Sequence, residues 1–115
     1  MRIALLASMT LALTTTAFAQ SLSGNQIRET LIGNSFSGVA DGESYSEHLN
    51  PDGTISGRSP AGTYAGKWRI SGNEICFSHA EGKRDTKWDC TEVKLMGGRV
   101  IWDDNTTAKL GESAR

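Results

Sequence analysis

The sequence predicts an all-β protein: a small antiparallel barrel or sandwich of about seven or eight short strands with a short N-terminal helix. Short segments in which apolar and polar residues alternate are separated by turn residues about every 8–12 positions. No alternation of strands with long helical segments is present, which argues against a parallel sheet. The chain has 13 glycines, all after residue 19 and spread along it, as many tight turns require.

Residues 1–19 have the three parts of a cleavable secretory signal peptide. Arg2 supplies the positive charge, Ile3–Leu13 is an apolar run, and Ala17-Phe18-Ala19 is an A-x-A cleavage site. The run is shorter than the ~20 apolar residues that a bilayer-spanning helix needs. We therefore expect cleavage after Ala19, a periplasmic or secreted location, and no membrane insertion of the mature chain.

The part of the chain after the signal peptide is long enough for one domain. We expect this β domain to span residues 20–103. Residues 104–115 are polar without clear periodicity, which predicts a flexible C-terminal tail. The formal net charge of the full chain is −1, with no basic stripe, and this argues against nucleic acid as a partner.

Two cysteines, Cys76 and Cys90, are the only ones in the chain. Export would place them in an oxidising compartment, where a disulfide forms and persists. The bond would close a loop of about 15 residues, which the chain-entropy model equates with about 3 kcal/mol of stability. The alternative is a pair of free or metal-binding thiols, but the spacing matches no common metal motif.

A short helix is predicted over residues 24–32. Ser23 can cap its first turn, and Gln26 completes a capping box. Gly33 can end the helix in a left-handed conformation. The helix is too short to be stable alone, so its apolar face must pack on one end of a sheet or barrel, and that face carries Ile27, Leu31 and Ile32.

Seven strands are then predicted, with an exposed loop over Ala80–Lys87 between the fifth and the last two. In the second strand Tyr45, Glu47 and Leu49 share one face. The fourth strand places Lys67 and Arg69 opposite an apolar face. The seven predicted strands are Ser35–Ala40, Glu43–Asn50, Thr54–Arg58, Thr63–Ile70, Glu74–Ser78, Trp88–Leu95 and Arg99–Asp103, and the apolar face of the fourth carries Tyr64, Gly66, Trp68 and Ile70.

Gly66-Lys67-Trp68 resembles the G-x-W signature of calycin-type barrels, the lipocalin superfamily. The longer string, from the turn at residues 51–53 through this strand to Cys76 and Cys90, resembles a group of small exported proteobacterial β-barrel proteins of unknown function. It is also similar, more weakly, to barrel-type periplasmic inhibitors of metalloproteases. The likeness covers residues 30–103 and implies a fold more than a function. Because the chain is much shorter than a lipocalin, it implies a cavity that is small or filled by side chains.

Aromatic residues are the candidates for ligand binding. Tyr45, Tyr64, Trp68 and Trp88 are expected either to line a pocket or to fill a thin core. His48 and His79 stand apart from other metal-ligand or nucleophile residues in sequence, so we interpret them as surface histidines. No catalytic residue, metal site or cofactor is predicted.

These observations favour a non-catalytic exported binding module in the cell envelope, with a protein or a small apolar molecule as its partner. An enzyme is not expected, because no nucleophile, base and orienting group can be assembled from the motifs. Two alternatives stay open. One is a structural or stress-related periplasmic protein without a defined ligand, and the other is an inhibitor of a periplasmic protease or lysozyme.

Overall fold

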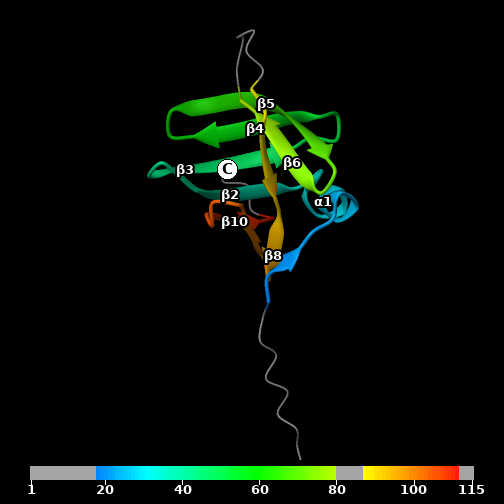
Figure 1. Ribbon diagram of the computed structural model, residues 1–115. Helices are drawn as coiled ribbons and strands as arrows, with labels where there is room; N and C mark the ends of the chain where they lie inside the picture. Colours follow the sequence, from blue (N-terminus) through cyan, green and yellow to red (C-terminus); the bar gives the residue numbers. More distant parts are fainter. Residues whose placement is uncertain (1–17, 80–86, 112–115) are drawn as a thin grey trace, which may run out of the picture.

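The computed structural model describes residues 18–79 and 87–111. Within these residues one antiparallel sheet of ten strands curls into a nearly closed barrel, with a single short helix (Figure 1). Most of the predicted signal peptide and most of the predicted loop at 80–87 lie outside the described residues. The elements are β1 Gln20–Ser21, α1 Gly24–Leu31, β2 Ser35–Ala40, β3 Glu43–Leu49, β4 Thr54–Ser59, β5 Gly62–Ser71, β6 Glu74–Ser78, β7 Asp89–Glu92, β8 Lys94–Met96, β9 Arg99–Ile101 and β10 Thr107–Leu110.

The sheet closes because residues 89–96, one continuous stretch of chain, pair with strands at both ends of the strand order. The strand order is β1-β8-β9-β10-β2-β3-β4-β5-β6-β7. Only Val93 separates β7, which pairs with β6, from β8, which pairs with β1 and β9. The two halves of this extended run therefore belong to opposite ends of the strand order, and the sheet must curl round to join them.

The barrel interior follows the two-residue alternation that the sequence predicts. Leu49, Ile55, Ile75 and Val100 are almost completely buried, and each comes from a different strand. On β5, Trp68 is buried whereas the neighbouring Lys67 and Arg69 are exposed. Barrel closure places every inward side chain against the others, so a chain with few large aliphatic residues still forms one continuous core.

Helix α1 packs against one end of this barrel, as predicted. Ser23 accepts a hydrogen bond from the Gln26 backbone, and the Gln26 side chain accepts one from the Ser23 N–H, so the capping box is present. The Gly24 N–H donates to the Asn73 side chain in the β5–β6 turn at 3.0 Å. Gly33 has a φ of 82°, the left-handed conformation expected after the helix.

Three details of the predicted strands are corrected. The number is ten rather than seven or eight, because β1 and β10 have no strong pattern of their own. The predicted strand Trp88–Leu95 begins one residue later and changes partners at Val93. This break follows from barrel closure, which a single stretch of sequence does not reveal.

The predicted flexible tail at 104–115 is wrong for its first part. Strand β10 lies between β9 and β2, with Ala108 buried to 1% exposure and Leu110 partly buried. Asn105 has a φ of 64° and turns the chain back from β9. Two apolar residues in a four-residue strand are too few to show a period, which is why the sequence did not indicate it. Residues 112–115 lie outside the described part.

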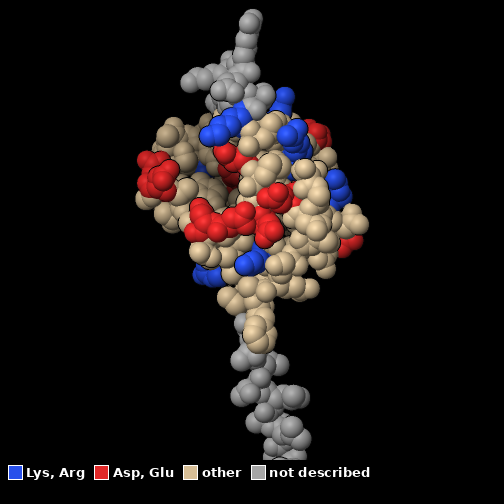
Figure 2. Space-filling model, in the orientation of Figure 1, with Lys and Arg blue, Asp and Glu red and all other residues tan. Residues whose placement is uncertain are grey.

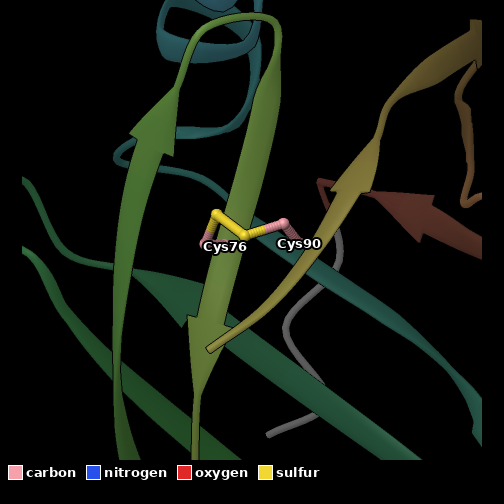
Figure 3. The surroundings of a disulfide bond; sticks show 2 residues. All are labelled: Cys76 and Cys90. Atoms are coloured by element: carbon pink, nitrogen blue, oxygen red, sulfur yellow. A yellow bond between two sulfur atoms is a disulfide. The ribbon is translucent and has the colours of Figure 1, made fainter. Parts of the chain in front are cut away.

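Cys76 and Cys90 form the predicted disulfide (Figure 3). The two residues are direct partners across the β6–β7 pair, so the bond joins neighbouring strands of one hairpin. Cys76 is fully buried, whereas Cys90 is exposed and belongs to the lining of the cavity described below. No helix among the described residues is long and apolar enough to cross a membrane.

Replacing both cysteines by alanine should lower the free energy of unfolding by about 3 kcal/mol, because the loop of the unfolded chain is then no longer closed. Urea unfolding followed by tryptophan fluorescence measures the difference. Mild reduction of the unmodified protein should give the same loss. A change well below ~1 kcal/mol in both experiments would show that the hairpin pairing alone holds β6 and β7 together.

Candidate ligand-binding cavity

A cavity of about 910 Å³ opens at the end of the barrel opposite α1. Its lining comes from the end of β2, the start of β3, the end of β4, the start of β5, the end of β6, the start of β7 and the β9–β10 turn, which all meet at this end. The helix instead contacts the β5–β6 turn. One end of the barrel is thus closed by a helix, and the other is hollow. This corrects the small or filled cavity that the short chain implied.

Aromatic rings form the wall of this cavity, and Phe36 is at their centre. Phe36 is 2% exposed, and its ring lies 6.3 Å from that of Tyr45, 6.4 Å from that of Phe77 and 5.4 Å from that of Trp102. Phe77 and Trp102 also meet edge to face at 5.8 Å. All four residues line the cavity. Edge-to-face packing of this kind is the favoured arrangement of aromatic pairs.

A buried carboxylate stands at the side of this wall. Glu47 is 7% exposed, and its Oε1 accepts a hydrogen bond from the Tyr64 hydroxyl at 2.8 Å. The Nε2 atom of His79 lies 2.9 Å from the same oxygen. The His79 ring also stacks on Phe77, with 6.2 Å between centroids, and meets Tyr64 edge to face. The charge of a buried carboxylate is tolerable only with such partners.

A glycine makes the Tyr64 contact with Glu47 geometrically feasible. Glu47, Gly57 and Tyr64 are direct partners across β3, β4 and β5, so Tyr64 and Glu47 are two strands apart, about 9.6 Å at the usual strand spacing. The tyrosine ring crosses this gap by lying over Gly57, where an added Cβ would fall only 2.2 Å from the ring. Gly57 therefore leaves the space that the tyrosine occupies.

A second glycine makes room for the histidine. A Cβ added at Gly66 would lie 2.7 Å from the Ser78 carbonyl oxygen and 3.3 Å from the His79 ring. The backbone of the β6 end can therefore approach β5 closely and place His79 beside Glu47. The glycine of the G-x-W sequence thus has a structural reason in this protein, because it lets the end of β6 come close to β5.

The Glu47 carboxylate changes the ionisation of its neighbours. The pKa of His79 is raised, chiefly by the hydrogen bond to Glu47 and further by the charges of Glu47 and Asp89, against the opposing effect of burial. Burial, the hydrogen bond to Glu47 and its charge all raise the pKa of Tyr64. The pKa of Tyr45 is also raised, first by burial and then by Glu47. Both tyrosines are therefore neutral hydroxyl donors at physiological pH.

The raised His79 pKa predicts a pH dependence with a definite sign. The folded state holds the proton more tightly than the unfolded state, so the contribution to stability is full below the ordinary histidine pKa of about 6.5 and is lost as pH rises through the folded-state pKa. Because the ring is 45% exposed, this contribution should stay below about 1 kcal/mol. Titration of the ring protons by NMR should show the His79 pKa falling in Glu47→Gln. An unchanged His79 pKa in that variant would contradict the contact.

Carboxylates dominate the charged groups of the cavity. Figure 2 shows red acidic side chains gathered around a hollow on this face of the molecule. Among the described residues that line the cavity there is neither a lysine nor an arginine, and His79 is the one group that can carry positive charge. The acidic lining residues are Glu43, Glu47, Asp89, Asp103 and Asp104.

The structure places only two of the four predicted ligand-binding residues at the cavity. Tyr45 and Tyr64 line it. Trp68 is buried towards the end of the barrel on which α1 packs, and its Nε1 donates to the Asn50 carbonyl oxygen at 2.8 Å. Trp88 lies against Arg69, whose guanidinium carbon is 4.3 Å from the indole centroid, and it does not line the cavity within the described residues.

The interpretation of the two histidines as surface groups agrees with the exposure of His79, whose side chain is 45% exposed, and is wrong for His48. His79 belongs to the cavity through Glu47, and His48 is partly buried, with Nδ1 2.7 Å from the Ser35 hydroxyl. Sequence reasoning also missed Phe36, Phe77 and Trp102. Their inward positions on β2 and β6, and at the end of β9, were readable from alternation, but their meeting at one end of the barrel was not.

Among residues 18–79 and 87–111, no group of three histidine, cysteine, aspartate or glutamate side chains could hold a metal ion. No protein-family model, no curated protein and no solved structure matches the chain. The resemblance of Gly66-Lys67-Trp68 to the calycin signature and the signal peptide at 1–19 therefore stay predictions.

Proposed function

We propose that this protein is an exported, non-catalytic binding protein that takes a small molecule into the cavity at the open end of its barrel. The observation that carries the proposal is the cavity itself. Its volume of about 910 Å³ falls within the ~300–1,000 Å³ that is usual for ligand sites. Such sites are mostly apolar with a few polar groups, and the mouth of a β-barrel is a frequent place for them.

The polar groups of the cavity support a binding role because they are held in place. Glu47 is positioned by Tyr64 and His79, and these three side chains come from β3, β5 and the end of β6. Polar groups on strands of a rigid barrel keep their positions before a ligand arrives, which lowers the entropic cost of binding. A small molecule fits this concave site better than the flat surface of a protein partner does.

Export is supported by the disulfide and by the predicted signal peptide. A disulfide persists in the periplasm or outside the cell, and it is rare in the cytosol. Strand β1 begins at Gln20, the residue that predicted cleavage after Ala19 would expose. A disulfide-bonded fold without a membrane-spanning helix in its described part fits an exported protein.

Titration with N-phenyl-1-naphthylamine, a neutral probe that fluoresces in apolar surroundings, tests the proposal. We expect saturable binding of about one probe per chain. Ala40→Trp, which places a large side chain at the cavity lining, should weaken binding at least about tenfold, or 1.4 kcal/mol.

The matched control is Ala65→Trp, because Ala65 is exposed on β5 and outside the cavity lining. This variant should bind the probe as the unmodified protein does. Equal binding by Ala40→Trp, or no saturable binding at all, would contradict the proposal. The second result is the one expected of a structural protein without a ligand.

A further inference from the structure

We propose that the ligand of the cavity is an organic cation: a protonated amine or a quaternary ammonium group attached to a small apolar body. This inference rests on the proposed function and adds the chemical class of the ligand. It is carried by two features of the same cavity, the sign of its charged groups and the aromatic composition of its wall.

The charged groups favour a positive ligand. Five carboxylates line the cavity, and no lysine or arginine lies among the described lining residues. Glu47 is already paired with His79, whereas Glu43, Asp89, Asp103 and Asp104 are exposed residues of the cavity lining. Walls of low dielectric constant strengthen the field of such a rim inside a cleft. A cation is therefore attracted into the cavity, and an anion of the same shape is repelled.

The aromatic rings provide the second half of a cation site. The planes of Phe36 and Tyr45 are 83° apart, those of Phe36 and Trp102 are 62° apart, and those of Phe77 and Trp102 are 89° apart. Rings at these angles pack edge to face against one another, and Tyr45, Phe77 and Trp102 keep part of their surface exposed at the cavity. The face of an aromatic ring is its negative side, so a cation that lies over an exposed ring face in this wall is attracted to it.

The lining also explains why a purely apolar ligand is not the best fit. A neutral hydrocarbon body would use the rings but would partly desolvate the rim carboxylates without any compensating charge. An ammonium group at the mouth gives these carboxylates a positively charged partner. The apolar body of the ligand then lies against the aromatic wall formed by Tyr45, Phe77 and Trp102. Both kinds of lining residue are then used by one molecule.

Three phenols that differ mainly in charge test the inference by isothermal titration calorimetry on the full mature protein at neutral pH. Tyramine carries an ammonium group, 4-ethylphenol is neutral, and 3-(4-hydroxyphenyl)propionate carries a carboxylate. We expect tyramine to bind at least about tenfold more tightly than 4-ethylphenol, a difference of 1.4 kcal/mol. The carboxylate should bind more weakly than either.

Charge variants locate the effect. Asp89→Asn combined with Asp103→Asn removes two charges from the rim and should reduce the advantage of tyramine at least about threefold, with little change for 4-ethylphenol. The matched control is Glu29→Gln combined with Glu92→Gln, which changes the net charge equally at exposed positions outside the cavity lining. This control should keep the full preference for tyramine.

Ionic strength supplies an independent measurement. Raising it from about 0.01 M to about 1 M shortens the Debye length from about 30 Å to about 3 Å, so the advantage of tyramine should shrink while 4-ethylphenol binding stays constant.

Equal affinity for tyramine and 4-ethylphenol would overturn the inference and leave the proposed function standing, because the cavity would still bind a small aromatic molecule. A preference for tyramine that both double variants retain would also overturn it. Failure of all three phenols together with the naphthylamine probe would overturn the proposed function as well.

Discussion

Replacing Trp68 by alanine should lower the free energy of unfolding by about 3–5 kcal/mol, the usual cost of removing a large aromatic side chain from a core. The indole is 7% exposed, and its Nε1 donates to the Asn50 carbonyl oxygen at 2.8 Å. The Arg28 guanidinium lies 5.9 Å from the ring centroid, so the same side chain joins α1 to the barrel. Alanine would leave a cavity and would also remove one of the two hydrogen bonds that the Asn50 carbonyl oxygen accepts, the other coming from the Gly53 N–H at 3.1 Å. Urea unfolding followed by circular dichroism measures the loss.

The matched control for this prediction is Trp88→Ala. Trp88 is only partly buried and packs on Arg69, so its removal should cost no more than about 1 kcal/mol. Similar losses for the two variants would show that Trp68 is not the principal side chain of the closed end of the barrel.

Substitution of Gly57 by alanine should cost about 3–5 kcal/mol, although it adds a single methyl group. The new Cβ would fall 2.2 Å from the Tyr64 ring, which cannot stay where it is. Overpacking costs about 1–3 kcal/mol, and loss of a hydrogen bond to a charged group costs about 1.5–3 kcal/mol more. The ring must leave Glu47, and the shape of the cavity must change with it. Thermal and urea unfolding measure the effect on stability, and the naphthylamine probe measures the effect on the cavity.

Two variants separate this mechanism from a general intolerance of alanine. Gly98→Ala adds a methyl group where no atom lies within 4 Å and should change stability by less than about 0.5 kcal/mol. In a Tyr64→Ala background, Gly57→Ala should cost much less than it does alone, because the ring that it displaces is absent. Additive losses in the double variant would contradict the steric explanation.

Alternation along the strand that became β5 predicted which of its faces is inside, and this prediction is confirmed. Tyr64 and Trp68 were assigned to one face of their strand, and both do face the interior of the barrel. Which of the two lines the cavity was not predictable. They lie four residues apart on β5, and Tyr64 lines the cavity whereas Trp68 is packed in the core. The period of a strand contains no information about which end of the barrel is closed, and that depends on where α1 docks.

The Glu47 site was not predictable for a related reason. Its partners, Tyr64 and His79, are 17 and 32 residues away in sequence, and only the register of β3, β4, β5 and β6 brings them together. Gly57, the residue that makes the contact feasible, looks in the sequence like any other strand glycine. A glycine opposite an aromatic residue across a strand pair is the signal that could have been used, once the register was known.

The three tryptophans allow the most direct test of the central claim that ligand binds in the cavity at the open end of the barrel. Trp102 lines the cavity, Trp68 lies in the core towards the helix, and Trp88 packs on Arg69. Their indole N–H signals can be followed separately in a ¹⁵N–¹H NMR spectrum during titration with N-phenyl-1-naphthylamine. The Trp102 signal should shift in a saturable way, while those of Trp68 and Trp88 stay nearly constant. A shift confined to Trp88, or no shift of Trp102 at saturating probe, would contradict the claim.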